Sequence, residues 1–211
     1  TDLVGISLSY KAGEAYYIPI KHLDDTVNQI HQDLVLDILR PILETSKNKI
    51  IGQNIKFDRN VLAKYGISIS SIKNDTMMMS YVLDASATRH NLDALSSYYL
   101  NYKTSTFEDV AGKGVKQVTF DQVPINEATH YAAEDADITL RLYEELNPKL
   151  ETEDSLRKLN EEIEIPLIEV LSEMEQNGAI LNSKILKSQS KDLENRIKKL
   201  EKKAYDIAGE E

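Results

Sequence analysis

The sequence predicts an α/β domain in residues 1–150, followed by a mostly helical extension in residues 151–211. Strand-like and helix-like segments alternate through the first region, which is typical of α/β folds. Beyond it, strand patterns nearly disappear and charged, helix-like segments dominate. Hydrophobic residues make up 41% of the chain and charged residues 28%, a balance that excludes a disordered protein.

The first expected elements are two strands and a helix. Residues 3–10 and 16–20 read as strands, and the turn-like residues 11–14 between them predict an antiparallel hairpin. Residues 33–44 carry apolar side chains at helical spacing. Pro41 lies inside that helix and predicts a kink.

Four more helices are expected before residue 150. They cover residues 54–65, 76–83, 91–100 and 126–146. The first follows a short strand at residues 49–52 and ends at Gly66. Asn54 and Asp75 are expected to cap the first two helices. Pro148 is expected to stop the last one.

The C-terminal region is expected to be helical. Residues 155–176 form a helix that Pro166 interrupts or kinks, and residues 179–181 form a brief strand. Ser183 caps a long final helix with a narrow apolar seam between charged flanks. Such a helix protrudes or pairs with a partner helix.

Composition limits the possible functions. The chain has no cysteine, which excludes disulfides and thiolate metal sites and suits a reducing cytoplasm. It has no apolar run long enough for a membrane span and no signal-peptide pattern at its start. The net charge of −10 argues against a simple DNA-coating protein. An enzyme that holds phosphates through divalent metals can be acidic, because the metals bring positive charge.

Two acidic motifs could carry chemistry. Tyr131 and Asp135 are four residues apart and share one face of the long helix, although an acidic surface stripe would show the same spacing. Asp58 lies one turn into a helix that follows a strand, and Gln53 and Asn54 bring amide groups to its N-terminus, where phosphate binds readily. In a purely structural interpretation, Asn54 caps this helix and Asp58 complements its dipole.

Together the motifs predict a divalent-metal site. Asp58 and Asp135 are carboxylates from different helices, which suit Mg²⁺ or Mn²⁺, with Zn²⁺ as an alternative. Two such ions can stabilise the attacking and leaving oxygens of a phosphoryl displacement. The Tyr131 hydroxyl could orient the attacking water.

Five separated segments resemble the family A (DNA polymerase I-like) enzymes. IIGQNIKFDRNVLAKYGI is similar to their second exonuclease motif, and HYAAEDADITLRLY to their third, of the tyrosine-containing DEDD type. DTMMMSYVLDASATRHNLDALSSYYL and TFEDVAGKG lie between them in matching order. EIEIPLIEVLSEMEQNGAILN resembles the start of the polymerase domain, and the last helix resembles the start of the thumb.

The resemblance implies a ribonuclease H-like fold, a mixed sheet flanked by helices, and proofreading 3′–5′ hydrolysis of single-stranded DNA ends. Asp58 and Asp135 would bind the two metals, and Tyr131 would position the attacking water. The implied substrate-binding residues are Gln53, Asn54, Arg89 and Phe107. The parent would be a bacterial, cytoplasmic, nucleoid-associated monomer that also binds primer-template DNA and contacts no membrane.

One part of the family pattern is missing. The first motif, an Asp-x-Glu on the first strand, does not occur near Thr1. We therefore expect residues 1–150 to be an N-terminally truncated exonuclease domain and residues 151–211 to begin the polymerase domain with thumb helices. We also expect these 211 residues alone to be inactive or nearly so.

Two other functions are consistent with the motifs. A ribonuclease D-like exonuclease would act on RNA, but the polymerase-like segment 163–182 argues against it. A non-catalytic domain with a degenerate exonuclease fold would only bind DNA, but the joint presence of Asp58, Tyr131 and Asp135 argues against that. A coiled-coil interaction protein would explain nothing in residues 1–150.

Overall fold

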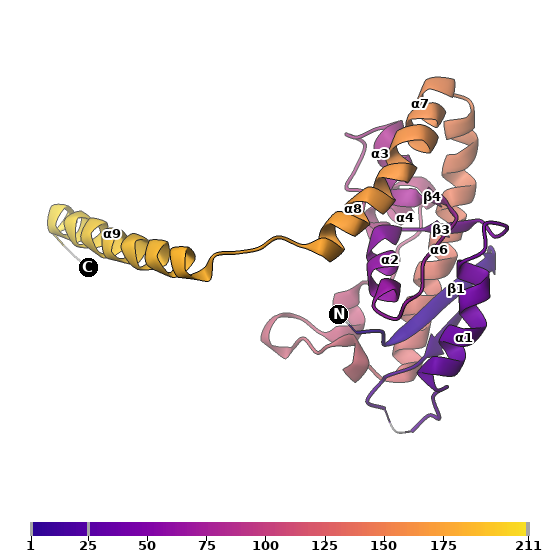
Figure 1. Ribbon diagram of the computed structural model, residues 1–211, viewed down its shortest axis with the longest axis horizontal. Coiled ribbons are helices and arrows are strands. Elements are labelled where there is room, and N and C mark those ends of the chain that lie inside the picture. The colour runs from indigo at the N-terminus through magenta and orange to yellow at the C-terminus, as the bar shows by residue number, and fades with distance from the viewer. Residues whose placement is uncertain (1, 25, 210–211) are drawn as a thin grey trace. The chain divides into compact units, whose positions relative to one another are not determined.

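The computed structural model describes residues 2–24 and 26–209 and divides into two compact units (Figure 1). The first unit is Thr1–Gln176 and the second is Asn177–Glu211. The first unit extends past residue 150, so the α/β region and the helices after it pack as one body. No helix among the described residues combines the length and apolarity that crossing a bilayer requires.

The strands form two small sheets. β1 (Gly5–Lys11) and β2 (Glu14–Pro19) pair antiparallel, which confirms the predicted hairpin. Gly13 turns the chain between them with φ +83°, a left-handed conformation that glycine adopts without strain. β3 (Ile50–Gly52) and β4 (Ile72–Asp75) pair parallel.

The arrangement of the strands differs from the expectation in two ways. The described residues form two separate two-stranded sheets rather than one mixed sheet. β4 was not predicted, because its sequence, Ile-Lys-Asn-Asp, lacks the alternation that marks a strand. Its pairing with β3 and the burial of Asn74 and Asp75 hold it in place.

Helices cover the sheets of the first unit. They are α1 (Gln32–Leu43), α2 (Ile55–Ala63), α3 (Thr76–Leu83), α4 (Leu92–Leu100) and α6 (Ile125–Glu151). Helix α6 contacts both strands of the hairpin, β3, α3 and α4, and Figure 1 shows it extending along the unit. It is therefore the central element to which the others attach.

The segment 101–124 contains three short helical turns, for which the sequence predicted no helix. They are α5 (Phe107–Ala111), η1 (Gly114–Lys116) and η2 (Phe120–Gln122). Thr106 and Asp109 form a reciprocal capping box at the start of α5. These turns are too short for periodicity to reveal them.

Helix α6 continues through Pro148, so the predicted stop was wrong. Leu146 and Leu150 are buried beside Met79 in one apolar cluster. Burying a leucine stabilises by about 1.5–3 kcal/mol. That gain offsets the roughly 3 kcal/mol that a proline inside a helix costs.

A helical arm, residues 154–176, completes the first unit. It consists of α7 (Asp154–Leu159), a π-helical turn η3 (Asn160–Glu164) and most of α8 (Ile165–Asn177). The predicted interruption is confirmed, and the π turn lies directly before Pro166. Ile168 of the arm is 5% exposed and packs into the main core.

The second unit is dominated by one helix, α9 (Ser183–Ala208). Its cap is Asn182, whose side chain accepts a hydrogen bond from the Ile185 amide, rather than the predicted Ser183. Residues 179–181 form no strand, because no strand pairs with them among the described residues. The apolar seam of α9 is exposed, as expected for an unpaired helix.

Met79 gives a direct test of the packing around α6. Met79→Ala is expected to lower the free energy of unfolding by roughly 2–5 kcal/mol, because the removed side chain leaves a cavity in a fully buried cluster. Met174→Ala, at a position that is 62% exposed, should change it by less than about 0.5 kcal/mol. Urea unfolding followed by circular dichroism measures both, and equal losses would contradict the packing described here.

Candidate active site

Tyr131 and Asp135 form a close pair on α6. Their four-residue spacing places them on one helical face, as predicted, and each side chain shifts the pKa of the other. Burial raises the pKa of Tyr131 above its usual value, and the nearby Asp135 carboxylate raises it further. The hydroxyl therefore keeps its proton at neutral pH.

Asp135 lies in a concentration of negative charge. Burial raises its pKa to about 7, with Asp93 and Glu134 adding like charge, while the Tyr131 side chain opposes the shift. Glu134 is held in place by the Tyr102 hydroxyl and the Ser105 amide, each at 2.7 Å. The acidic cluster is therefore ordered by the chain around it.

Asp58 occupies the first turn of α2, as predicted. The residue is exposed at the protein surface. Neighbouring protein atoms that displace water raise its pKa to about 6, and the Asp75 carboxylate adds to the shift. Asp58 is therefore a second carboxyl group whose ionised form is disfavoured when no cation is bound.

The structure pairs Tyr131 with Asp135 but does not join Asp58 to them. No hydrogen bond or ion pair links Asp58 to either residue in the described part of the chain. Nor do the described residues contain a group of three or more His, Cys, Asp or Glu side chains placed to hold one metal ion. The convergence of all three on one metal site stays a prediction.

Asp75 braces two helices rather than one. Its carboxylate accepts hydrogen bonds from Met77 and Met78 at the start of α3, the predicted cap. It also accepts from Asn54 and Ile55 at the start of α2, at 3.1 and 2.7 Å. Parallel pairing of β3 and β4 brings the two helix starts together, which sequence spacing did not reveal.

Asn54 therefore does not cap α2 with its side chain, contrary to the expectation. It adopts a left-handed conformation, φ 56° and ψ 46°, which asparagine tolerates better than most residues. Asp75 instead satisfies the helix N-terminus. Asn54 is exposed, and its contact with substrate stays a prediction.

Gln53 is engaged inside the protein. Its amide accepts a hydrogen bond from the Thr76 hydroxyl and donates to the His90 carbonyl at 2.8 Å. His90 in turn contacts Ser80 at 3.0 Å. Gln53 thus ties β3 to α3 and to the start of α4, and its role in substrate binding stays a prediction.

Phe107 and Tyr131 belong to one aromatic cluster. Their ring centroids are 6.3 Å apart, and Phe120 lies 6.3 Å from Phe107 and 5.9 Å from Tyr131. Phe120 also contacts Tyr17 and His22 from the N-terminal hairpin region. Phe107 keeps 37% of its surface exposed, so one ring both supports the tyrosine and faces solvent.

Sequence reasoning missed Phe120. It is the only Phe, Tyr or Trp between Phe107 and Tyr131, which is the signal that could have identified it. Arg89 is exposed and has no ion-pair partner among the described residues. Its guanidinium is thus available to an anion.

Asp135→Asn is expected to stabilise the metal-free chain at pH 8. The folded-state pKa of Asp135, about 7, exceeds its ordinary value of 3.8, so the folded state binds this proton more tightly than the unfolded chain does. The associated stability is complete below about pH 4 and disappears as the pH rises through 7. At about 1.4 kcal/mol for each pKa unit, the gain at pH 8 should be roughly 1–4 kcal/mol.

Urea unfolding between pH 4 and pH 8 in a chelator measures this gain. Asp192→Asn on the exposed helix α9 is the matched control and should change stability by less than about 0.5 kcal/mol. A loss of stability in Asp135→Asn that is equal at both pH values would contradict the assignment.

Comparisons with known proteins identify relatives of this chain. DNA polymerase I of Pseudomonas aeruginosa is 47% identical over 213 residues, which cover all of this chain and 23% of that protein. DNA polymerase I of Borreliella burgdorferi is 40% identical, over 88% of this chain and 20% of that protein. The chain thus spans about a quarter of these relatives or less.

A solved structure shares the fold. The POL domain of Pol1 from M. smegmatis, in complex with DNA primer-template and dNTP, matches with a TM-score of 0.70 at 20% identity. The match covers all of this chain and 32% of that one. A family model described as 3′–5′ exonuclease matches residues 1–151. The chain therefore belongs to the 3′–5′ exonuclease family of A-type DNA polymerases.

Proposed function

We propose that this chain forms part of a metal-dependent 3′–5′ exonuclease that removes nucleotides from single-stranded DNA ends and proofreads within a DNA polymerase. The observation that carries the proposal is the Tyr131–Asp135 pair beside the exposed ring of Phe107. A polarising carboxylate, a protonated hydroxyl and an aromatic platform then lie on one side of α6. A carboxylate can bind metal, a hydroxyl can orient water and an aromatic ring can stack on a base, which together suit hydrolysis at a DNA end.

The proposal includes a ribonuclease H-like fold, residues 1–150 as the exonuclease domain and residues 151–211 as the start of the polymerase domain. Family membership and the POL-domain likeness support these assignments. The proposed partners are a single-stranded 3′ end and, for the longer protein, primer-template DNA bound by a monomer.

The residues present have the donor chemistry for Mg²⁺ or Mn²⁺. Asp58 and Asp135 offer carboxylate oxygens, the ligands that these cations prefer. Burial, together with the neighbouring carboxylates, raises the pKa of Asp135, and a bound cation would favour its charged form. Since the described residues hold no group of three ligands, we propose that further ligands come from outside this set. Bound divalent ions would activate water and stabilise charge on the phosphate.

The chain's own residues then have separate tasks. Tyr131, which is protonated and close to Asp135, would hold the attacking water in line with the phosphate. Phe107 would stack on a terminal base, which grips DNA without regard to sequence. Arg89 would contact a backbone phosphate. Phe120 would keep Phe107 and Tyr131 in place by packing against both.

Phe107→Ala is expected to weaken binding of single-stranded DNA. Loss of one base–aromatic stack corresponds to about 1–3 kcal/mol, or roughly five- to 150-fold in Kd. Fluorescence anisotropy with a labelled oligothymidine measures it. Tyr98→Ala, which removes an exposed aromatic side chain from α4, is the control and should leave Kd within about twofold. Equal effects at both positions would count against the stacking role.

The 211-residue chain is expected to digest DNA slowly or not at all. Two carboxylates fall short of the ligand set that two-metal hydrolysis needs. A 3′-labelled single strand in Mg²⁺ or Mn²⁺ should therefore stay intact over hours, whether the chain is wild type or Asp135→Ala. Rapid digestion by the wild type, abolished in Asp135→Ala, would show that these residues suffice.

A further inference from the structure

We propose that the helical arm of residues 154–176 is a positioning element of the nuclease site, acting on α2 through Asn60 and Asn160. The inference rests on the proposed function, in which Asp58 of α2 binds metal. It assigns to the arm a role in the exonuclease reaction in addition to any role in joining domains.

The arm holds α2 through a polar contact centred on Asn60. The Asn60 carbonyl oxygen accepts hydrogen bonds from the Ser172 hydroxyl at 2.7 Å and the Gln176 amide at 3.1 Å. Its amide nitrogen donates to Glu175 at 2.7 Å. Three side chains of α8 thus satisfy one side chain of α2, and Ser172 is fully buried.

Ion pairs flank this contact on the same side of α2. Lys56 pairs with Glu175, and Arg59 pairs with Glu169 at 2.7 Å. These pairs are partly exposed and contribute modestly to stability, but they give the contact a defined register. The arm therefore binds α2 along more than one turn.

Helix geometry connects the contact with Asp58. At 3.6 residues per turn, Asp58 and Asn60 project about 200° apart. Ile55 and Leu62, which are 2% and 8% exposed, face the core. The core and the arm together prevent α2 from rotating about its axis, and such a rotation would redirect the Asp58 carboxylate.

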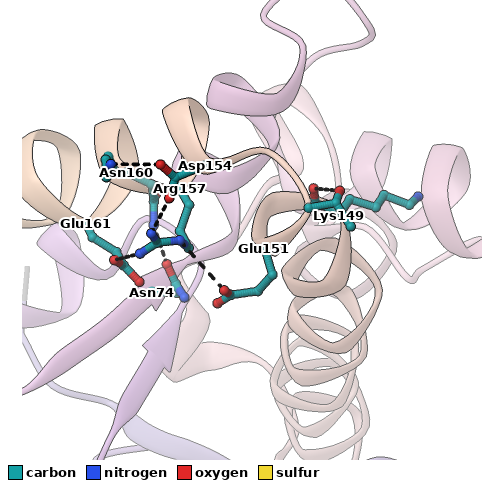
Figure 2. A network of polar contacts seen from close by, with 9 residues as sticks. Asn74, Lys149, Glu151, Asp154, Arg157, Asn160 and Glu161 are labelled. Atoms are coloured by element: carbon teal, nitrogen blue, oxygen red, sulfur yellow. Dashed lines mark hydrogen bonds and ion pairs between the residues drawn. The ribbon is translucent and has the colours of Figure 1, made fainter.

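A second contact reaches the start of α2. Asn160, fully buried in the π-helical turn, donates a hydrogen bond of 2.6 Å to the side chain of Asn74. Figure 2 shows both residues beside Arg157. Asn74 adjoins Asp75, whose carboxylate holds the Asn54 and Ile55 amides. The arm thus holds α2 directly at Asn60 and, through Asn74 and Asp75, at its first residues.

The same view provides a matched control. Arg157 pairs with Glu151, Asp154 and Glu161, all outside α2 (Figure 2). Arg157→Ala removes charge interactions from the arm without touching the contact of Asn60 with α8. A general weakening of the arm can therefore be separated from loss of the contact.

The test reverses the polarity of the Asn60–Glu175 hydrogen bond. Asn60→Asp places a second carboxylate against Glu175 and removes the donor. Adding Glu175→Gln supplies a donor from the other side, so the double variant restores the bond in the opposite direction. Glu175→Gln alone keeps an acceptor for Asn60.

Amide hydrogen exchange in α2 and Mn²⁺-induced broadening of amide signals near Asp58 are measured on the 211-residue chain. Asn60→Asp should speed exchange of the α2 amides about tenfold and weaken the Mn²⁺ effect by a similar factor. The double variant should recover most of both effects. Glu175→Gln alone and Arg157→Ala should stay within about twofold of wild type.

The two readouts separate this inference from the proposed function. Unchanged exchange in Asn60→Asp, absence of rescue, or an equal effect of Arg157→Ala would overturn the role of the arm. Absence of Mn²⁺ broadening near Asp58 in the wild type would overturn the metal assignment, while rescued exchange would still support the hold on α2. If Asn60→Asp does not fold, Ser172→Ala should speed α2 exchange about threefold, and no change there would also overturn the inference.

Discussion

The buried carboxylate of Asp75 is the interaction on which the site depends. It is 1% exposed and accepts four backbone hydrogen bonds, two from the start of α2 and two from the start of α3. Burial raises its pKa, while those N–H groups and two helix dipoles favour the charge. A neutral or shorter side chain would leave helix N-termini unsatisfied and release the segment that carries Asp58.

The carboxylate of Asp135 lowers the stability of the fold, and apolar packing along the rest of α6 offsets that loss. Asp135 has a raised pKa because burial and neighbouring carboxylates disfavour its charged form. Within about three turns after Asp135, the same helix buries Ile138, Leu142 and Leu146 almost completely. One continuous helix therefore holds repelling carboxylates at one position and apolar packing at others. Sites that concentrate like charge are commonly supported in this way by stability elsewhere.

An aromatic cluster anchors the segment that is least regular in sequence. Phe120 packs against rings from the hairpin region, α5 and α6, and Val123 beneath it is fully buried. His22 contacts the Val123 carbonyl at 3.1 Å. This packing keeps Phe107 beside Tyr131 although only short helical turns connect α5 with α6. A loop can therefore present a ring in a fixed place when a second ring supports it.

Sequence alone determined what short-range spacing controls: the hairpin, the Asp75 cap of α3, and the shared face of Tyr131 and Asp135. Tertiary structure decided the rest, including β4, the second helix held by Asp75, and the passage of α6 through Pro148. The physical reason is the sequence distance over which the interactions act. Propensity and capping act within a few residues, whereas these features depend on burial and hydrogen bonds between segments far apart in the chain.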